Sequence, residues 1–487
     1  MSEPLLCEMS VPGRIGVRFP EPDVPMEPLP DTLIRKELPL PELSEVDVVR
    51  HFTRLSQLNY SIDTGFYPLG SCTMKYNPKI NEETARLPGF AQVHPLQPTE
   101  TVQGCLALMY DLQEWLKEIA GFAGVTLQPA AGAQGELTGV LIIRAYNESH
   151  GQFQRNKILI PDSAHGTNPA TSAMSGMRVV EIKSDSRGNV DLEGLRAECD
   201  DTLAGLMLTN PNTLGLFDEN VEEVIRLVHE VGGLVYGDGA NMNALLGIVR
   251  PGDLGFDLLH YNLHKTFSTP HGGGGPGSGP VGVAAHLVDF LPGPVVSIIE
   301  EGDEAEDLPP LYGFVTPTKS IGRLKSFNGH FGMMVRAYTY MLMHGREGNR
   351  QIAEYAVLNA NYLLARLRGA YHVPFDRICM HEFVMEGRWD DVPDIHALDI
   401  AKRLMDYRFH PPTNYFPLIV HEALMIEPTE TESKQTLDAF ADALLQIAHE
   451  AHSDPELVKS APHITPVGRL DEVRAAKELV LCCAVGT

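Results

Sequence analysis

Short apolar segments alternate with amphipathic segments between Lys157 and Lys265, and this alternation limits the possible folds more than any other feature. We expect strands in KILIPDS from Lys157, MRVVEIKS from Met177, AGLMLTNPNT from Ala204, GLVYGDG from Gly233 and FDLLHYNLHK from Phe256. We expect helices in DLEGLRAEC and NVEEVIRLVHEV, which repeat their apolar residues at helical spacing. Strands separated by helices pair in parallel. The sequence therefore predicts an α/β fold with a mostly parallel, doubly wound sheet.

Polar segments follow these predicted strands where each one ends. They are DSAHGTNPA from Asp162, TNPNTLG from Thr209, GDGAN from Gly237 and HKTF from His264. Ligands of open α/β sheets bind at the carboxyl ends of the strands. We therefore expect a binding site where these segments meet.

An acid and a lysine in these segments indicate one kind of cofactor. Asp238 ends one apolar run and Lys265 ends the next. A lysine can form a Schiff base with pyridoxal 5′-phosphate, and a carboxylate keeps the ring nitrogen of that cofactor protonated. His165 is our candidate for an imidazole stacked on the ring. Each residue has a simpler interpretation alone: Asp238 as a turn cap, Lys265 as a surface lysine and His165 as a structural histidine.

A small-residue turn upstream is the candidate phosphate site. In QPAAGAQGELTGVLIIRAYNE, residues 128–148, a helix is expected to begin near Gly132. Free N–H groups at a helix start bind anions. We therefore assign the phosphate to Gly132, Ala133 and Gln134, with His264 reaching it from beside the lysine. Tight packing is the simpler interpretation of such a turn.

The remaining segments suggest an arm and a second domain. Residues 1 to about 45 are rich in proline and acidic residues, which favours an extended arm that contacts a neighbour. A helix is expected from Ser44, and a long helical region from about 320 to 369 breaks near Gly345. An acidic loop near residues 300–310 and a smaller α+β unit are also expected. We divide the chain into an arm and loop segment (1–90), a cofactor-binding domain (91–330) and a small domain (331–487).

Composition excludes several classes of protein. The formal net charge of −26, without clusters of Lys and Arg, argues against nucleic acid as a partner. No apolar run reaches the roughly 18 residues that a membrane helix needs, and the N-terminus lacks a secretory signal pattern. The seven cysteines are scattered without metal-site spacing. We expect reduced thiols, no metal and a cytoplasmic location.

Several long motifs resemble one family. They are FYPLGSCTMKYNP, QPAAGAQGE, DSAHGTNPA, GDGAN, NLHKTF, HGGGGPG and HPPTNYFPLIVHEALMIEPTETESK. From about Thr64 to Lys434 the chain resembles the P-protein of the glycine cleavage system, glycine dehydrogenase (decarboxylating). Members occur as one long chain or as two shorter subunits. At 487 residues this chain resembles the second, catalytic subunit of the split form.

The resemblance implies fold type I, pyridoxal phosphate bonded to Lys265, and decarboxylation of glycine. It implies transfer of the aminomethyl group to the lipoyl disulfide of the H-protein, so no nicotinamide site is needed. It also implies a heterotetramer of the α2β2 type with P-protein subunit 1. Asn210 and Thr213 lie where similar enzymes contact the ring oxygen of the cofactor.

Some assignments that the resemblance suggests remain open. Lys75, His94 and Arg323 are candidates for the substrate carboxylate or the lipoyl channel, whereas Cys72 has no visible base and is not proposed as a nucleophile. Two alternative functions also remain. One is another fold type I decarboxylase that uses the same cofactor, and the other is a non-catalytic assembly subunit.

Overall fold

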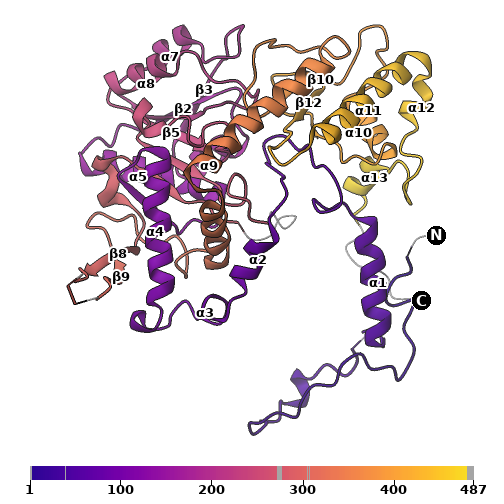
Figure 1. The fold of residues 1–487 in the computed structure, drawn as a ribbon, viewed down its shortest axis with the longest axis horizontal. Helices are drawn as coiled ribbons and strands as arrows, with labels where there is room; N and C mark the ends of the chain where they lie inside the picture. Colours follow the sequence, from indigo (N-terminus) through magenta and orange to yellow (C-terminus); the bar gives the residue numbers. More distant parts are fainter. Residues whose placement is uncertain (1–2, 39, 271–276, 304, 307, 480–487) are drawn as a thin grey trace. The chain divides into compact units, whose positions relative to one another are not determined.

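The computed structural model describes residues 3–38, 40–270, 277–303, 305–306 and 308–479 (Figure 1). The chain forms two compact units. One comprises Met1–Gly65 with Ser460–Thr487, and the other is Phe66–Lys459. The predicted boundaries at residues 90 and 330 follow a different division and stay a prediction.

The smaller unit contains the predicted arm. Its regular elements are η1 (Asp31–Leu33), α1 (Glu45–Leu58) and α13 (Glu472–Lys477). The Ser44 hydroxyl accepts a hydrogen bond from the Asp47 N–H at 3.2 Å, so Ser44 caps α1 as predicted. The Val11 N–H donates to the Glu42 carbonyl at 3.0 Å. The arm therefore turns back on itself within its own unit.

A seven-stranded sheet organises the larger unit. Its strands are β1 (Gly124–Thr126), β2 (Lys157–Pro161), β3 (Arg178–Ile182), β4 (Leu203–Thr209), β5 (Leu234–Gly239), β6 (Leu258–Tyr261) and β7 (Val281–Val283). The order is β1-β7-β6-β5-β4-β2-β3, in which β7 runs antiparallel to both neighbours and β2 to β6 run parallel. This confirms the predicted mostly parallel sheet and all five predicted strands.

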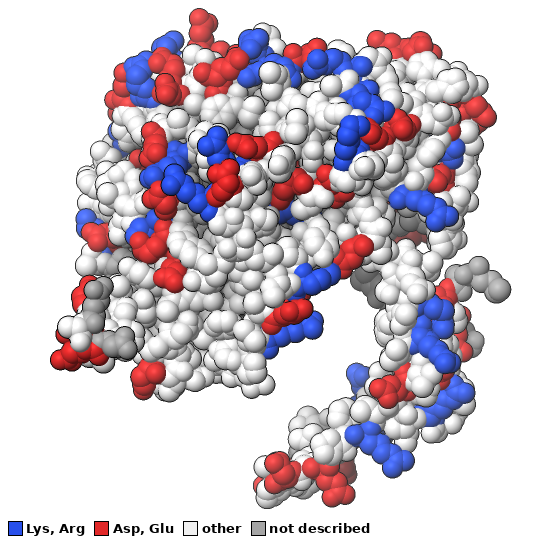
Figure 2. Space-filling view, viewed as in Figure 1, with Lys and Arg blue, Asp and Glu red and all other residues white. Residues whose placement is uncertain are grey.

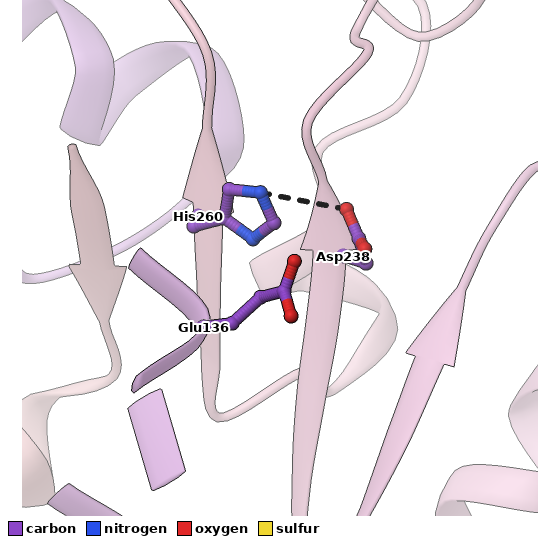
Figure 3. Close-up of side chains that lie close together, drawn as sticks. All are labelled: Glu136, Asp238 and His260. Atoms are coloured by element: carbon purple, nitrogen blue, oxygen red, sulfur yellow. Dashed lines mark ion pairs between the residues drawn. The ribbon is translucent and has the colours of Figure 1, made fainter. Parts of the chain in front are cut away.

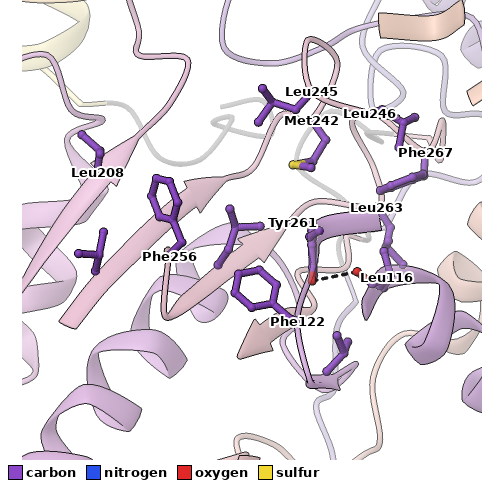
Figure 4. Close-up of a cluster of buried hydrophobic side chains, with 14 of the residues drawn as sticks. Leu116, Phe122, Leu208, Met242, Leu245, Leu246, Phe256, Tyr261, Leu263 and Phe267 are labelled. Carbon is purple, nitrogen blue, oxygen red and sulfur yellow. Dashed lines mark hydrogen bonds between the residues drawn. The ribbon is translucent and has the colours of Figure 1, made fainter. Parts of the chain in front are cut away.

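Helices cover both faces of this sheet. They are α4 (Gln103–Ala120), α5 (Gly132–Ser149), α6 (Thr167–Met174), α7 (Leu192–Glu198) and α8 (Val221–Glu230). Successive strand residues point to opposite faces. Leu259 and Tyr261 of β6 thus join the buried cluster that includes α4 and α8, whereas Leu258 joins the cluster around α5. Figure 4 shows part of the first cluster, where the Tyr261 hydroxyl donates to the Leu116 carbonyl at 3.3 Å.

Helix α5 lies close to the sheet because its inner face carries glycine. A Cβ atom on Gly139 would lie 2.4 Å from the Tyr236 ring. After β6, the chain returns past the start of α5, where a Cβ atom on Gly279 would lie 2.3 Å from the Ala131 carbonyl oxygen. Residues 271–276 of the glycine run after Lys265 lie outside the described residues.

The predicted α+β unit packs around a second, three-stranded sheet of order β10-β12-β11. Its elements are β10 (Phe383–Glu386), α10 (Ala397–Asp406), β11 (Thr413–Asn414), β12 (Ala423–Ile426), α11 (Lys434–Ser453) and α12 (Pro455–Lys459). Helix α9 (Phe331–Leu367) precedes it and is interrupted at Gly345, where φ is 58° and ψ is −170°. The predicted break is confirmed, but the helix begins at Phe331 and not near residue 320.

Shorter elements complete the larger unit. They are α2 (Lys79–Ala85), α3 (Pro88–Ala91), η2 (Thr99–Thr101), η3 (Pro251–Leu254), η4 (Ala285–Phe290), β8 (Val295–Glu300) and β9 (Leu311–Val315). Strands β8 and β9 pair as a hairpin around the predicted acidic loop. The sequence did not predict this pairing, because the acidic residues of the loop dominate its composition.

Acidic and basic side chains are interspersed on the face shown in Figure 2. The Arg187–Glu219 and Arg144–Glu148 pairs, at 2.8 and 2.7 Å, are examples of such neighbours. Among the described residues, we find no helix with both the length and the apolar character required to cross a membrane.

Candidate active site

A cavity of about 260 Å³ opens at the carboxyl ends of β4, β5 and β6. The start of α5, the segment after β2, the loop at Ser71 and Cys72, and the residues before β10 complete its wall. Among the predicted site residues, those that line it are Lys265, Asp238, His165, Gly132, Ala133, His264 and Thr213. The cavity lies at the predicted edge of the sheet, and it brings together residues separated by more than a hundred positions in the chain.

Asp238 lies near the end of β5 and is only 8% exposed. One of its carboxylate oxygens accepts a hydrogen bond from the Ala240 N–H at 3.1 Å. Its cross-strand neighbour on β6 is His260, whose Nε2 atom lies 3.5 Å from the same oxygen (Figure 3). The Tyr236 hydroxyl hydrogen-bonds the other ring nitrogen, Nδ1 of His260. Strand pairing therefore holds the imidazole beside the carboxylate.

Glu136 is a second buried acid in this cluster, and the sequence analysis did not single it out. It lies on the first turns of α5 and points toward Asp238 in Figure 3. Burial, together with the nearby Asp238 charge, raises the pKa of Glu136 to about 7. The Thr167 hydroxyl donates to its carboxylate at 2.7 Å. Glu136 belongs to the motif that predicted the phosphate turn, but a single acid on a helix does not by itself indicate a functional residue.

His165 lies exposed at the cavity wall, between β2 and α6. Its Nδ1 atom lies 2.9 Å from the Thr167 hydroxyl, and its ring meets Phe416 edge to face at 5.6 Å between centroids. Burial of the ring lowers the pKa of His165. The negative charge of Asp238 raises this pKa, and the positive charge of Lys265 lowers it. A neutral imidazole at this position is compatible with the predicted stacking role.

Lys265 follows β6 after a short turn and is half-buried at the cavity wall. Its Nζ atom donates a hydrogen bond to the Ser71 carbonyl oxygen at 2.7 Å. Ser71 and Cys72 also line the cavity. Burial raises the pKa of the Cys72 thiol, so this group lies in the site in its neutral form.

The start of α5 faces the cavity through Gly132 and Ala133. The first N–H groups of a helix have no acceptor within that helix and can bind an anion. The Gln134 side chain instead accepts from the Ala130 N–H at 2.7 Å, so it braces the turn and does not line the cavity. The His264 Nδ1 atom accepts from the Ser278 N–H at 3.2 Å. The cofactor contacts assigned to these residues stay predictions.

Asn210 and Thr213 differ in their surroundings. Thr213 lines the cavity and its hydroxyl donates to the Ser163 carbonyl. The Asn210 side chain accepts from the Asp218 N–H at 3.0 Å and does not line the cavity. Asn210 therefore shapes the segment after β4, and its predicted contact with the cofactor is not tested by this geometry.

The three further candidates from the sequence lie outside this cavity. Lys75 is 3% exposed and donates to Glu430 at 2.7 Å and to the Tyr340 hydroxyl at 3.2 Å. His94 lines a separate cavity of about 370 Å³, and Arg323 is exposed. Lys75 is thus engaged in a buried ion pair, and binding of substrate by any of the three stays a prediction.

A buried acidic pair near the loop at Ser71 was also missed. Glu382 lines the cavity and is 3% exposed, and Glu427 behind it is fully buried. Glu382 immediately precedes β10, and Glu427 immediately follows β12. The available signal was an acid directly adjoining an apolar strand, in HEFVME and in ALMIEP. Only the pairing of those strands shows that the two acids meet.

The cavity wall fits an anionic, polar cofactor. Four polar atoms of its lining residues are buried without a hydrogen-bond partner: Thr209 Oγ1, Asn262 Oδ1, His381 Nδ1 and His260 Nε2, the last of which faces Asp238 at 3.5 Å. Buried polar atoms are normally satisfied, so these atoms await a polar ligand. A Cβ atom on Gly132 would lie 3.0 Å from Asn262 Nδ2, so a larger residue at this position would reduce the space in the cavity. The orphan atoms, the helix start and Lys265 match the chemistry of pyridoxal phosphate.

Solved structures share this fold. A glycine decarboxylase (P-protein) of the glycine cleavage system in inhibitor-bound form matches with a TM-score of 0.71 at 21% identity, over 86% of this chain and 93% of that one. The glutamate decarboxylase of Lactobacillus brevis matches with a TM-score of 0.65 at 14% identity, over 87% and 96%. The fold is that of fold type I pyridoxal-phosphate enzymes.

Sequence comparisons narrow this class to one family. Residues 352–463 match the family model "Glycine dehydrogenase, C-terminal domain". A probable glycine dehydrogenase (decarboxylating) subunit 2 from Caldanaerobacter subterraneus is 59% identical over 98% of both chains. One from Listeria monocytogenes serotype 4b is 56% identical over 98% of this chain and 97% of the relative. The chain belongs to the family of glycine dehydrogenase (decarboxylating) subunit 2. The family is one of enzymes, and the fold supports pyridoxal phosphate as its cofactor.

Proposed function

We propose that this chain is the catalytic subunit of a glycine decarboxylase in the glycine cleavage system, with pyridoxal phosphate bonded as a Schiff base to Lys265. One observation carries the proposal: Lys265, Asp238 and the start of α5 line the same cavity. These are a lysine for the aldehyde, a carboxylate for the ring nitrogen and N–H groups for the phosphate. The family of the chain supplies glycine as the substrate.

The side chains divide the work by charge and position. Asp238 presents a buried carboxylate for the ring nitrogen, and His260 lies beside it on the adjacent strand. His165, which lines the same cavity, is the residue that would stack on the ring, while Gly132, Ala133 and His264 would hold the phosphate. Pyridoxal phosphate, when bound, supplies an electron sink that accepts the charge left on carbon as CO2 departs.

The acceptor of the aminomethyl group is the lipoyl disulfide of the H-protein. One lipoyl sulfur bonds to the carbon of glycine as the S–S bond breaks, and the other sulfur takes a proton. The disulfide is thereby reduced while the carbon is oxidised, and the chemistry balances without a nicotinamide cofactor. We propose P-protein subunit 1 as the partner, in an α2β2 assembly located in the cytoplasm. The name "subunit 2" of the relatives supports a partner subunit.

The test is to co-express this chain with candidate first subunits and assay the exchange of labelled CO2 into glycine. Exchange that requires lipoylated H-protein is expected. The same sample should absorb at roughly 400–430 nm, as a pyridoxal Schiff base does, and Lys265→Ala should lose this band. Release of methylamine without a carrier would instead indicate an ordinary decarboxylase. A band that persists unchanged in Lys265→Ala would overturn the assignment of the lysine.

A further inference from the structure

The loop that holds Lys265 has an unfavourable backbone conformation. Ser71 and Thr73 have φ angles of 62° and 48°. Residues with side chains rarely adopt this left-handed region, and they persist there only where surrounding contacts hold them. Specific contacts are therefore needed to hold Ser71 and Thr73 in this conformation.

Two buried glutamates supply those contacts. The Ser71 N–H donates to Glu382 Oε2 at 2.7 Å, and the Thr73 N–H donates to Glu427 Oε2 at 2.9 Å. The Thr73 hydroxyl also donates to Glu427 Oε1 at 2.8 Å. Each strained residue is thus held by its own carboxyl group.

The small sheet places the two glutamates side by side. Phe383 of β10 pairs with Ile426 of β12, and Glu382 and Glu427 occupy the next position beyond this pair. An oxygen of each lies within 4.8 Å of the other. Burial and mutual repulsion raise the pKa of Glu382 to about 8. Burial raises the pKa of Glu427 to about 7. The pair thus holds a proton near neutral pH and can take up more negative charge when a cation approaches.

That cation is the ammonium group of Lys265. Its Nζ atom donates to the Ser71 carbonyl oxygen at 2.7 Å, on the residue whose N–H is held by Glu382. The positive charge of Lys265 acts in the direction that lowers the pKa of both Glu382 and Glu427, against the larger effect of burial. Nearby negative charge stabilises a protonated amine at a partly buried site.

We propose that the Ser71 carbonyl and the Glu382–Glu427 pair form the holding site for the Lys265 ammonium group while Lys265 is not bonded to the cofactor. This inference rests on the proposed role of Lys265. When the amine of glycine displaces the lysine, one C–N bond forms and one breaks. The two protons that the glycine nitrogen loses pass to the nitrogen of Lys265, which becomes a neutral amine. The proton that the Glu382–Glu427 pair holds near neutral pH then converts this amine to the ammonium group, and the negative charge left on the pair stabilises that group.

Other titratable groups also adjoin this site. They are the Cys72 thiol beside Ser71, the His381 imidazole 3.6 Å from Glu382, and the Lys75–Glu430 ion pair that Asn243 links to Glu427. Burial lowers the pKa of His381 to about 3, so its ring is neutral. Lys75 and Glu430 compensate each other at 2.7 Å. The charge of Lys265 also acts on Glu136, His165 and His260, and Asp238 lines the same cavity. The carboxyl pair is thus the negative group on the side of the Ser71 loop, where Lys265 donates its hydrogen bond.

The test measures how the full chain captures its cofactor. Cofactor-free protein, with its partner subunit where the two copurify, is mixed with pyridoxal phosphate at a series of pH values. The rate of appearance of the band at roughly 400–430 nm is recorded. The neutral amine is the attacking form. Without the counter-charge the amine loses its proton more readily, so Glu382→Gln with Glu427→Gln should lower the pH midpoint by about one unit, a tenfold change in proton concentration.

Glu432→Gln is the matched control. Burial also raises the pKa of Glu432 to about 7, but this residue does not line the cavity, so the midpoint should stay at the wild-type value. If circular dichroism shows that the double variant is unfolded, Glu382→Gln alone carries the test. Its amide oxygen can still accept from the Ser71 N–H, and a smaller shift toward acid is expected.

Two results would overturn the proposal, and they are distinguishable. A wild-type midpoint in folded Glu382→Gln, or a shift toward alkali, removes the holding site while leaving the Lys265 assignment intact. A wild-type protein that forms no band, or a band that survives Lys265→Ala, removes the proposed function itself.

Discussion

The Nε2 atom of His260 lies 3.5 Å from a carboxylate oxygen of Asp238, and both side chains are buried. The Tyr236 hydroxyl engages the opposite ring nitrogen, so the imidazole cannot turn away. Burial lowers the pKa of His260, and the ring is therefore neutral. A neutral imidazole lies against the Asp238 carboxylate without cancelling its charge, which stays available for a cation in the cavity.

Asp238→Asn should therefore leave the fold intact and remove the charge that keeps the ring nitrogen protonated. We expect turnover to fall by about 100-fold or more, because the electron sink weakens. The measurement is glycine-dependent CO2 exchange at saturating glycine, with circular dichroism as the check on folding. Asp289→Asn, on the exposed side of η4, is the control and should retain full activity. Wild-type turnover in Asp238→Asn would remove this residue from the mechanism.

Glu136 should make stability depend on pH in a predictable direction. Its pKa is about 7 in the folded chain, whereas the ordinary pKa of a glutamate side chain is 4.5, so the folded state binds more protons between these pH values. Its contribution to stability is present below about pH 4.5 and is lost as the pH rises to about 7. Glu136→Gln should thus gain up to about 3 kcal/mol relative to wild type across this window.

Urea unfolding of both proteins at the two ends of the window measures this gain. Glu148→Gln is the control on the same helix, since Glu148 is exposed and pairs with Arg144 at 2.7 Å on the surface. Its effect should be small and nearly independent of pH. A constant difference between Glu136→Gln and wild type at every pH would contradict the raised pKa.

Gly139→Ala should destabilise the packing of α5 on the sheet. The added Cβ atom would lie 2.4 Å from the fully buried Tyr236 ring, which contacts His260. We expect a loss of about 1–3 kcal/mol in the free energy of unfolding, as for other overpacked cores. Gly104→Ala, on α4 with open space around it, should instead stabilise the chain by up to about 1 kcal/mol. Equal effects of the two changes in thermal or urea unfolding would show that close packing does not explain Gly139.

The sequence pattern predicted the fold correctly in those elements whose buried residues follow a regular pattern. Strands β4 and β5 are buried along almost their whole length, so they read as continuous apolar runs, and α8 presents a regular apolar face. The hairpin of β8 and β9 was missed because several of its residues are exposed. Few of its positions are buried, so the two segments lack the apolar runs that mark a strand. Helix α6 was missed because polar and small residues fill it.

The site followed from chemistry at strand ends, but only in part. A lysine, an acid or a histidine directly after a buried strand often contacts a ligand, which is why the sequence pointed to three residues. These are Lys265, Asp238 and His165, and all three line the cavity. Gln134 and Asn210 occupy equally suggestive positions, yet their side chains bond to the neighbouring backbone. Side-chain direction depends on local hydrogen bonds, which a motif does not specify.

The sequence by itself determined which strands end in an acid, a lysine and a histidine, because those residues follow apolar runs directly and the parallel sheet aligns the ends of the runs. It did not determine how Glu382 and Glu427 meet the loop that holds Lys265. Ser71 and Glu382 are 311 positions apart, and their contact depends on the register of β10 and β12 and on the placement of the small sheet beside the cavity. The physical reason is that local pattern encodes burial and direction, whereas contacts over this separation arise only when packed elements close on one another.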